Sequence, residues 1–320
     1  MTHAATEIRL AARPGALPTL DDFEVAQVDV TAPAPGQVLV RNLFTSLDPG
    51  MLTRMRGEYV PGKVMTGDAV GEVVASADPS LREGDLVRHL LGWRDYALAD
   101  ASRFMPVPRD IYPSASYYLG FGLNAYAGLT AIAELRAGDT VFVSSAAGAT
   151  GGLAGQIARL MGAGRVIGSA GSPEKVVHLT DRLGFDSGFD YRHGSIADHL
   201  RTAAPDGVDV FFDNVGGAQL RAAIEVMNPF GRIAMHGFLA HDGDLGDLRT
   251  VIGRRLTLRG FTVTDHMGLI AEFGPRLRTW LDNGQIVYDE TVIDGLSNAP
   301  QALLDLLAGR FTGKVVVSIG

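Results

Sequence analysis

The chain of 320 residues contains no cysteine. This absence excludes disulfide bonds, zinc–thiolate sites and cysteine nucleophiles together. The chain also lacks an apolar run long enough to span a bilayer, and residues 1–13 do not follow the signal-peptide pattern. A net charge of −8 and a pI near 5.5 argue against a nucleic-acid or anionic-membrane partner. We therefore expect a cytoplasmic protein that binds neither nucleic acid nor membrane.

Histidine is the other common ligand of transition metals, and none of the eight histidines stands in an HExxH-type pair. We expect no metal site. In contrast, hydrophobic residues make up 46% of the chain, which is enough for a sizeable core. The length predicts two domains, and the 40 glycines are scattered at turns instead of forming a low-complexity tract.

The most informative segment joins a buried strand at 140–143 to a helix that begins near Leu153. Between them lies the small-residue run 146–152, Ala-Ala-Gly-Ala-Thr-Gly-Gly. A helix start offers unpaired N–H groups and a partial positive charge, and missing side chains let a pyrophosphate approach them. The segment predicts a phosphate site. The alternative is a tight corner that binds nothing, because glycine-rich turns have many uses.

Repeated alternation of strand and helix follows this segment. A second strand covers 165–169 and a second helix 173–182, and the pattern continues to residue 235. Such alternation is typical of a doubly wound parallel sheet, an α/β fold of Rossmann type whose ligand binds at the carboxyl ends of the strands. The continuation favours a nucleotide site over an empty corner.

The end of the second strand favours NADP over NAD. An NAD site usually has Asp or Glu there to bond the ribose 2′-OH, whereas Ser169, Ala170 and Gly171 stand at these positions. Ser172 and Lys175 are suited to a 2′-phosphate, and Arg192 adds a second cation. The alternative for the lysine is an ordinary solvated helix residue.

The flanking segments contain short β-type runs between Gly, Pro and Asp, for example 37–41, 69–75 and 84–88. Such spacing predicts a compact β-barrel-like domain. The C-terminal run 313–320 reads as another strand, which we expect to return to this first domain. We therefore predict a discontinuous domain of residues 1–125 and 286–320 and a nucleotide-binding domain of residues 126–285.

These segments carry a resemblance to a known family. The chain resembles the zinc-independent medium-chain dehydrogenases/reductases, nearest the branch of leukotriene B4 12-hydroxydehydrogenase/prostaglandin reductases, alkenal double-bond reductases and curcumin reductase. The resemblance implies a GroES-like catalytic domain, a Rossmann domain, and hydride transfer from NADPH to the activated C=C bond of an α,β-unsaturated ketone or aldehyde. The matching blocks are 46–49, 64–72, 122–129, 146–151, 171–175, 183–186, 212–217, 230–234 and 313–317.

The resemblance also implies roles for single residues in holding NADP(H). Lys175 matches the lysine on the 2′-phosphate, Tyr191 the tyrosine near the adenosine end, and Asn214 the asparagine near the nicotinamide. The complete expected cofactor set is Ala147, Gly148, Ala149, Thr150, Gly151, Gly171, Ser172, Lys175, Tyr191, Asn214, His236, Gly237, Phe261 and Val263.

The chain departs from the family pattern around the substrate. Gly50 and Leu52 replace a tyrosine and an arginine, and Gly253 replaces a tyrosine proposed to bond the substrate carbonyl or the cofactor ribose. Asn124 replaces a threonine, and His236 a small residue or cysteine. These changes predict a reshaped pocket for a small electrophilic substrate. Its expected residues are Asp48, Gly50, Tyr59, Tyr126 and Gly253.

The lost tyrosine leaves the group that polarises the carbonyl open. The candidates are a cofactor ribose hydroxyl, water, Asn124 and His236, since a histidine at a strand end faces the ligand and titrates near neutrality. The alternative for His236 is a structural histidine bonded to backbone. Tyr59 and Tyr126 are further candidate donors, and either is equally suited to be a pocket wall.

Two other functions stay open at this level: a quinone reductase or biosynthetic oxidoreductase with a reshaped pocket, and a nucleotide-binding protein without catalysis. The segment 255–263 reads as the last strand of the Rossmann sheet. An uncovered edge strand favours pairing with its symmetry mate, and the family forms dimers in this way, so we predict a homodimer. In the alternative, residues 269–280 of the same chain cover this edge.

Overall fold

The computed structural model describes residues 3–120, 122–240 and 248–320. The chain divides into two compact units: residues 1–121 with 290–320, and residues 122–289. Within the described residues, no helix combines the length and the apolar character that crossing a bilayer requires.

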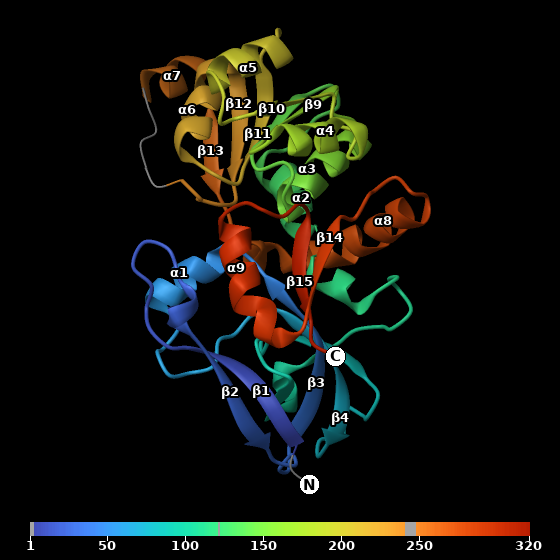
Figure 1. Cartoon of the computed structure of the whole chain (residues 1–320). Coiled ribbons are helices and arrows are strands. Elements are labelled where there is room, and N and C mark those ends of the chain that lie inside the picture. Colours follow the sequence, from blue (N-terminus) through green and yellow to red (C-terminus); the bar gives the residue numbers. More distant parts are fainter. Residues whose placement is uncertain (1–2, 121, 241–247) are drawn as a thin grey trace. The chain divides into compact units, whose positions relative to one another are not determined.

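The second unit contains a six-stranded sheet in the order β10-β9-β8-β11-β12-β13, in which every neighbouring pair is parallel. This is the order of a doubly wound sheet, whose direction of strand addition reverses next to β8. The fold class predicted from the β–α alternation is therefore confirmed (Figure 1). Its strands are β8 (Thr140–Val143), β9 (Arg165–Ala170), β10 (Ser187–Asp190), β11 (Val208–Asp213), β12 (Met227–Met235) and β13 (Thr257–Gly260).

Helices connect these strands along the chain, and the sheet is apolar on both faces. Val141, Phe142 and Val143 of β8 are all fully buried, as expected for a central parallel strand covered on both sides. The Phe142 ring stacks on that of Phe211 with centroids 4.7 Å apart. The helices are α2 (Leu123–Ala127), α3 (Ala149–Leu160), α4 (Pro173–Asp181), α5 (Ile196–Ala203), α6 (Gly217–Val226), α7 (Leu248–Arg254) and α8 (Ile270–Asp282), with shorter turns at Gly128–Ile132 and Val263–Leu269.

Two glycines let α3 approach its neighbours. A Cβ at Gly151 would lie 2.3 Å from the carbonyl oxygen of Ser145, and one at Gly155 would lie 2.0 Å from the ring of Phe185. No real Cβ sits that close to another heavy atom. The glycine-rich run predicted from the sequence is thus used for close packing of the helix as well as for the turn before it.

The first unit consists mainly of short strands, as predicted, and most of its neighbouring strands are antiparallel. Its larger sheet runs β14-β15-β3-β4-β5-β7, with β6 also paired to β3, and β1 pairs with β2 separately. The C-terminal strand β15 pairs with β3 of this unit, with Val315 opposite Leu47. The strands are β1 (His3–Leu10), β2 (Phe23–Val30), β3 (Gln37–Leu47), β4 (Ala69–Ser76), β5 (Leu86–His89), β6 (Tyr96–Asp100), β7 (Met105–Pro106), β14 (Glu290–Asp294) and β15 (Lys314–Ser318).

Two helices complete this unit, α1 (Gly50–Gly57) and α9 (Ala299–Leu307), with short 3₁₀ turns at Leu20–Asp22, Ala101–Arg103, Ala115–Leu119 and Leu296–Asn298. Met51 and Met55 of α1 are fully buried in a cluster with Trp93. This packing fixes α1 directly after the end of β3, where the predicted pocket residue Asp48 lies.

Candidate functional site

The expected cofactor residues all follow the carboxyl ends of strands in the six-stranded sheet. Residues 147–151 follow β8, residues 171–175 follow β9, and Tyr191 follows β10. Asn214 follows β11, residues 236–237 follow β12, and Phe261 and Val263 follow β13. Because all neighbouring strands are parallel, these residues lie along one edge of the sheet, the edge at which doubly wound folds bind their ligands.

The turn from β8 to α3 presents backbone rather than side chains. Ser145 has a positive φ of 51°, and Gly148 occupies the N-cap of α3 without a side-chain cap. The N–H groups of the first helical turn, from Ala149 to Gly151, have no partner inside the helix. The arrangement leaves these donors for an anion at the helix N-terminus.

The start of α4 gathers polar and cationic groups around Gly171. A Cβ at this glycine would lie 3.1 Å from the Tyr191 hydroxyl and 3.4 Å from the guanidinium carbon of Arg192. Ser172 caps the helix by accepting from the Lys175 N–H at 3.3 Å. Burial, followed by the charge of Arg192, lowers the pKa of Lys175. Two cations at a helix N-terminus fit an anion such as a 2′-phosphate.

Asn214 is held at the end of β11 by Ser144, the residue after β8. The Asn214 side chain donates from Nδ2 to the Ser144 carbonyl at 2.7 Å, and its main-chain N–H donates to Ser144 Oγ at 2.8 Å. The Ser144 hydroxyl donates in turn to Oδ1 of Asp213 at 2.9 Å. Burial raises the pKa of the Asp213 carboxyl, although hydrogen bonds to Oδ1 oppose this.

His236 lies against aromatic rings, with its ring centroid 5.3 Å from that of Phe261 and 6.2 Å from that of Phe212. Its Nδ1 is buried without a hydrogen-bond partner in the described part of the chain. Burial lowers the pKa of His236. Burial thus favours the neutral imidazole, which donates one hydrogen bond and carries no extra proton.

Tyr126 lies in α2 and is almost fully buried. Its hydroxyl donates to Glu272 Oε1 at 2.6 Å, and its ring stacks on Phe273 with centroids 4.8 Å apart. Burial and this bond raise the pKa of Tyr126 to about 12. The hydroxyl is committed to a carboxylate, which favours the structural alternative for Tyr126 over proton donation.

Asn124 and Gly253 have fewer neighbours. The side chain of Asn124, also in α2, is half-buried and makes no hydrogen bond within residues 122–240 and 248–320. Gly253 lies in α7, and a Cβ added there would meet nothing within 4 Å. Gly253 is exposed at the end of α7, just before the amino end of β13, so the structure does not bring this predicted pocket residue to the carboxyl edge of the sheet. Among the described residues, the Asn124 carboxamide has no hydrogen-bond partner.

In the first unit, Asp48 binds an arginine that sequence reasoning missed. Arg54 of α1 donates from Nη2 to Oδ2 of Asp48 at 3.0 Å. Burial opposes the charge of the Arg54 guanidinium, but Asp48 and Tyr59 outweigh it and raise its pKa. A Cβ at Gly50 would lie 2.9 Å from Asp48 Oδ1. Leu52 stands where the family has an arginine, and Arg54, two residues later in the same helix, binds the Asp48 carboxylate instead.

Tyr59 is buried, and its hydroxyl donates to the carbonyl oxygen of Thr66. Burial raises the pKa of Tyr59. Its ring centroid lies 5.9 Å from the Arg54 guanidinium carbon. The hydroxyl proton already has an acceptor, so this arrangement favours a pocket wall over a proton donor.

Asp213, Ser144 and Arg54 were not predicted as site residues, and no local pattern in the sequence could have indicated their pairing.

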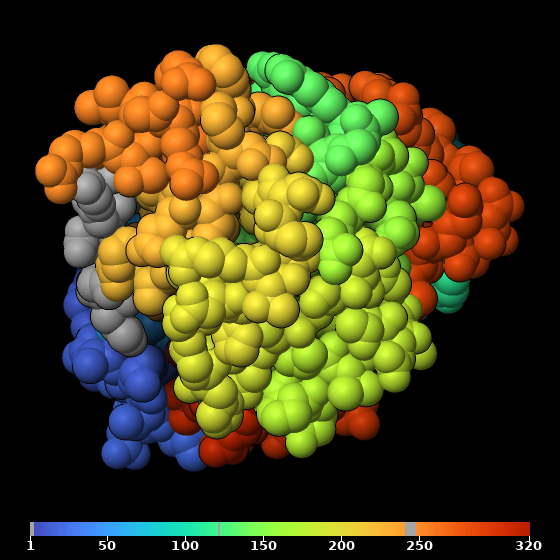
Figure 2. Space-filling view, turned by 90° about the horizontal axis from the view of Figure 1, so that it is seen from above, coloured from blue at the N-terminus to red at the C-terminus, as the bar shows by residue number. Residues whose placement is uncertain are grey.

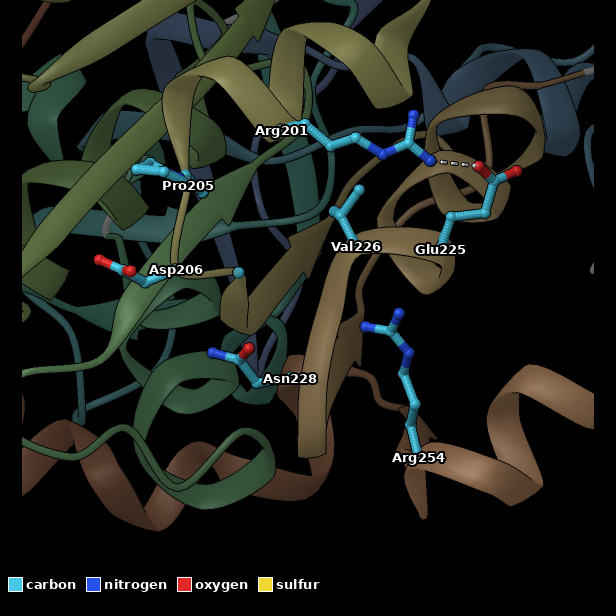
Figure 3. Close-up of a pocket in the computed structure, with 9 residues that line it drawn as sticks. Arg201, Pro205, Asp206, Glu225, Val226, Asn228 and Arg254 are labelled. Carbon is cyan, nitrogen blue, oxygen red and sulfur yellow. Dashed lines mark hydrogen bonds and ion pairs between the residues drawn. The ribbon is translucent and has the colours of Figure 1, made fainter.

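A separate cavity of about 330 Å³ lies at the opposite edge of the six-stranded sheet. It is lined from the loop before β11 and the junction of α6 with β12, the amino ends of both strands. Figure 3 shows Arg201 paired with Glu225 at 3.2 Å, and Arg254 reaching toward the same hollow. Figure 2 views this amino-end face from above, where the yellow and orange segments lie at the surface. This cavity therefore lies away from the carboxyl edge of the sheet, where the expected cofactor residues are.

No three His, Cys, Asp or Glu side chains in the described ranges gather closely enough to hold a metal ion.

Comparison with known proteins places both units in oxidoreductase families. Residues 6–107 match the family described as the N-terminal domain of oxidoreductase, and residues 149–278 match the zinc-binding dehydrogenases. The chain is 37% identical to the NADPH-dependent curcumin reductase of Escherichia coli, covering 97% of this chain and 95% of the relative. It is also 37% identical to the 2-alkenal reductase (NADP(+)-dependent) of Nicotiana tabacum, covering 94% of each.

Among solved structures, CurA from Vibrio vulnificus in complex with NADPH is similar, with a TM-score of 0.91 and 35% identity. The match covers 98% of this chain and 99% of that one.

Proposed function

Because the chain belongs to the zinc-independent branch of the medium-chain dehydrogenase/reductase superfamily, we propose that it reduces the activated C=C bond of α,β-unsaturated ketones or aldehydes with NADPH. The observation that carries this proposal is the start of α4. Lys175 and Arg192 lie together there, and no acid ends β9 to bind a ribose 2′-OH. Relatives whose names state NADP(H) as the cofactor support the same conclusion.

The residues along the carboxyl edge would hold NADP(H) in an ordered way. The N–H groups of residues 149–151 suit the pyrophosphate, and Lys175 with Arg192 suits the 2′-phosphate. Asn214 suits the nicotinamide end. The bound cofactor supplies the hydride of the reduction. The residues of this chain must then stabilise the negative charge that develops on the carbonyl oxygen.

Hydrogen-bond donors are sufficient for that task, because reducing an enone places negative charge on one oxygen. The hydroxyls of Tyr59 and Tyr126 already donate within the protein. Asn124, whose carboxamide makes no hydrogen bond among the described residues, is therefore the first candidate donor. Neutral His236 is the second, since an uncharged imidazole still donates one hydrogen bond. We propose that the proton that completes the reduction at carbon comes from solvent.

The test is consumption of NADPH, beside NADH, with a panel of enones, enals and quinones. We expect oxidation of NADPH with an enone or enal and formation of the saturated carbonyl product. Turnover of quinones alone would favour the second candidate, a quinone reductase. Tight binding of NADPH without turnover of any acceptor would contradict both and favour the nucleotide-binding protein without catalysis.

We further propose a cytoplasmic homodimer that pairs through β13. Within the described residues this strand has β12 as its single neighbour, and most of its side chains are exposed. An unpaired edge of a sheet is a ready surface for a second copy. Light scattering at micromolar concentration is expected to give twice the mass of the chain, whereas the mass of one chain would contradict the dimer. Cell fractionation tests the compartment.

A further inference from the structure

Asp213, which is buried, links three strand ends at the switch point of the parallel sheet through its carboxylate and its main-chain oxygen. The strand order reverses between β8 and β11, and Asp213 ends β11. Its Oδ1 accepts from the hydroxyl of Ser144, which follows β8, and its main-chain oxygen accepts from the His236 N–H after β12 at 2.8 Å. Ligands of open α/β sheets bind at such a reversal. The carboxylate therefore lies under the position where the fold predicts a ligand.

The Ser144 hydroxyl has only one hydrogen, and Asp213 takes it. The hydroxyl lone pairs are consequently turned toward Asn214, whose main-chain N–H donates to Ser144 Oγ at 2.8 Å. The Ser144 carbonyl accepts from Asn214 Nδ2 at 2.7 Å. Ser144 thus holds both the main chain and the side chain of Asn214, and Asp213 fixes the direction of the hydroxyl that does so.

The carboxamide oxygen of Asn214 is turned away from Ser144. Only a nitrogen can donate to the Ser144 carbonyl, so Nδ2 points inward and Oδ1 of the planar amide points away from it. No residue in the described ranges donates to this oxygen, and it is not among the side-chain atoms that are buried without a partner. Asn214 therefore presents an oriented hydrogen-bond acceptor.

Asp213 carries a feature that a purely structural residue would not need. Asp213 is fully buried, and the second oxygen of its carboxylate, Oδ2, has no hydrogen-bond partner among the described residues. Burying a carboxylate oxygen in this way costs stability. Oδ1, in contrast, accepts from three donors: Ser144 Oγ and the main-chain N–H groups of Val215 and Gly216, each at 2.9 Å. The carboxylate thus fixes Ser144 and the two residues that follow Asn214 in the chain.

We propose that Ser144 and Asp213 are positioning residues that orient the Asn214 carboxamide oxygen toward an N–H donor, the carboxamide of the nicotinamide ring of NADP(H). The inference rests on the proposed function and adds the two residues that act through Asn214. It requires that removal of the Ser144 hydroxyl weakens binding only while Asn214 is present.

The experiment is a double-mutant cycle with Ser144→Ala and Asn214→Ala, read out as the dissociation constant of NADPH by fluorescence titration. Loss of a neutral hydrogen bond predicts weaker binding by roughly three- to tenfold for Ser144→Ala. In the Asn214→Ala background the same change is expected to shift the constant less than about twofold, because residues that act through one another are not additive. Asp213→Asn is expected to weaken NADPH binding in the same Asn214-dependent way.

A second probe separates positioning from general damage to the unit. Adenosine 2′,5′-bisphosphate carries the 2′-phosphate end but no nicotinamide, so Ser144→Ala is expected to leave its dissociation constant unchanged. Ser116→Ala is the matched control, because Ser116 is also fully buried and its hydroxyl donates to a carboxylate, Glu290 Oε2, at 2.9 Å. We expect this control to lower the thermal unfolding temperature without changing NADPH binding. Ser144→Cys, which keeps the side-chain size, provides a second variant and is expected to behave as Ser144→Ala.

The outcomes are distinct. If the unmodified protein binds adenosine 2′,5′-bisphosphate and NADPH but Ser144→Ala weakens NADPH equally with and without Asn214, the inference is overturned and the proposed function stands. Equal weakening of both probes by Ser144→Ala would also overturn it. If the unmodified protein does not bind NADPH at all, the proposed function and the inference fail together.

Discussion

Lys175 is the residue whose removal tests the cofactor assignment most directly. We expect Lys175→Ala to weaken NADPH binding and to leave NADH binding almost unchanged, because only NADPH carries the 2′-phosphate. Hydrogen bonds to charged groups contribute about 1.5–3 kcal/mol, which corresponds to roughly 10- to 150-fold in affinity. Arg192 remains next to Gly171 in the variant and continues to attract the phosphate, so we expect a value toward the lower end, about 10- to 30-fold.

Further variants use the geometry of the same helix. Adding Arg192→Ala to Lys175→Ala is expected to bring the loss of NADPH affinity to about 100-fold or more, because the variant lacks both cations at the start of α4. Arg182→Ala is the matched control, because it removes a cation from the other end of α4, where Arg182 Nε binds Asp289 Oδ1 at 3.0 Å. Its effect on binding is expected to be less than about twofold, as for other exposed ion pairs.

The assay is titration of the protein with NADPH and with NADH, followed by the fluorescence of the reduced nicotinamide. An equal loss of affinity for both cofactors in Lys175→Ala would refute the reasoning, because it would mean that Lys175 supports the unit and not the phosphate. An unchanged preference for NADPH over NADH would refute it as well.

Three further predictions concern packing and titration. Gly155→Ala is expected to destabilise the protein by about 1–3 kcal/mol, because its Cβ would overlap the Phe185 ring. The control is Gly274→Ala in α8, whose Cβ would meet nothing within 4 Å and which is expected to stabilise the protein by up to about 1 kcal/mol. Thermal unfolding of both variants measures these changes. The parent protein is expected to lose more stability than His236→Phe between about pH 7 and 5, because burial lowers the folded pKa of His236 and the unfolded chain then binds the extra proton; equal losses in urea unfolding would contradict this. Tyr126→Phe is expected to cost roughly 1 kcal/mol of stability and to change turnover less than about twofold, since the Tyr126 hydroxyl is bound to a carboxylate at 2.6 Å. A large loss of turnover in a stable variant would instead identify Tyr126 as a proton donor.

The sequence alone determined the architecture of the second unit and the edge at which its site lies. The alternation of apolar strand and amphipathic helix is local, and parallel strands must bring all their carboxyl ends to one side. The small residues of the run 146–152 and the absence of an acid at residues 169–171, where β9 ends, are equally readable without a structure. The return of β15 to the first unit also followed from its place in the chain, after the α/β alternation had ended.

The tertiary structure alone decided how the polar groups of the site are paired. Tyr126 bonds to a residue 146 positions away, and Ser144 bonds to Asp213, 69 positions away. Burial, not residue type, set the pKa of His236 below its usual range. A side chain's hydrogen-bond partner and its loss of solvent depend on segments that are distant in the sequence, and no local pattern encodes them. The sequence therefore determined where the site lies, and the packing of distant segments determined which of its groups can still act.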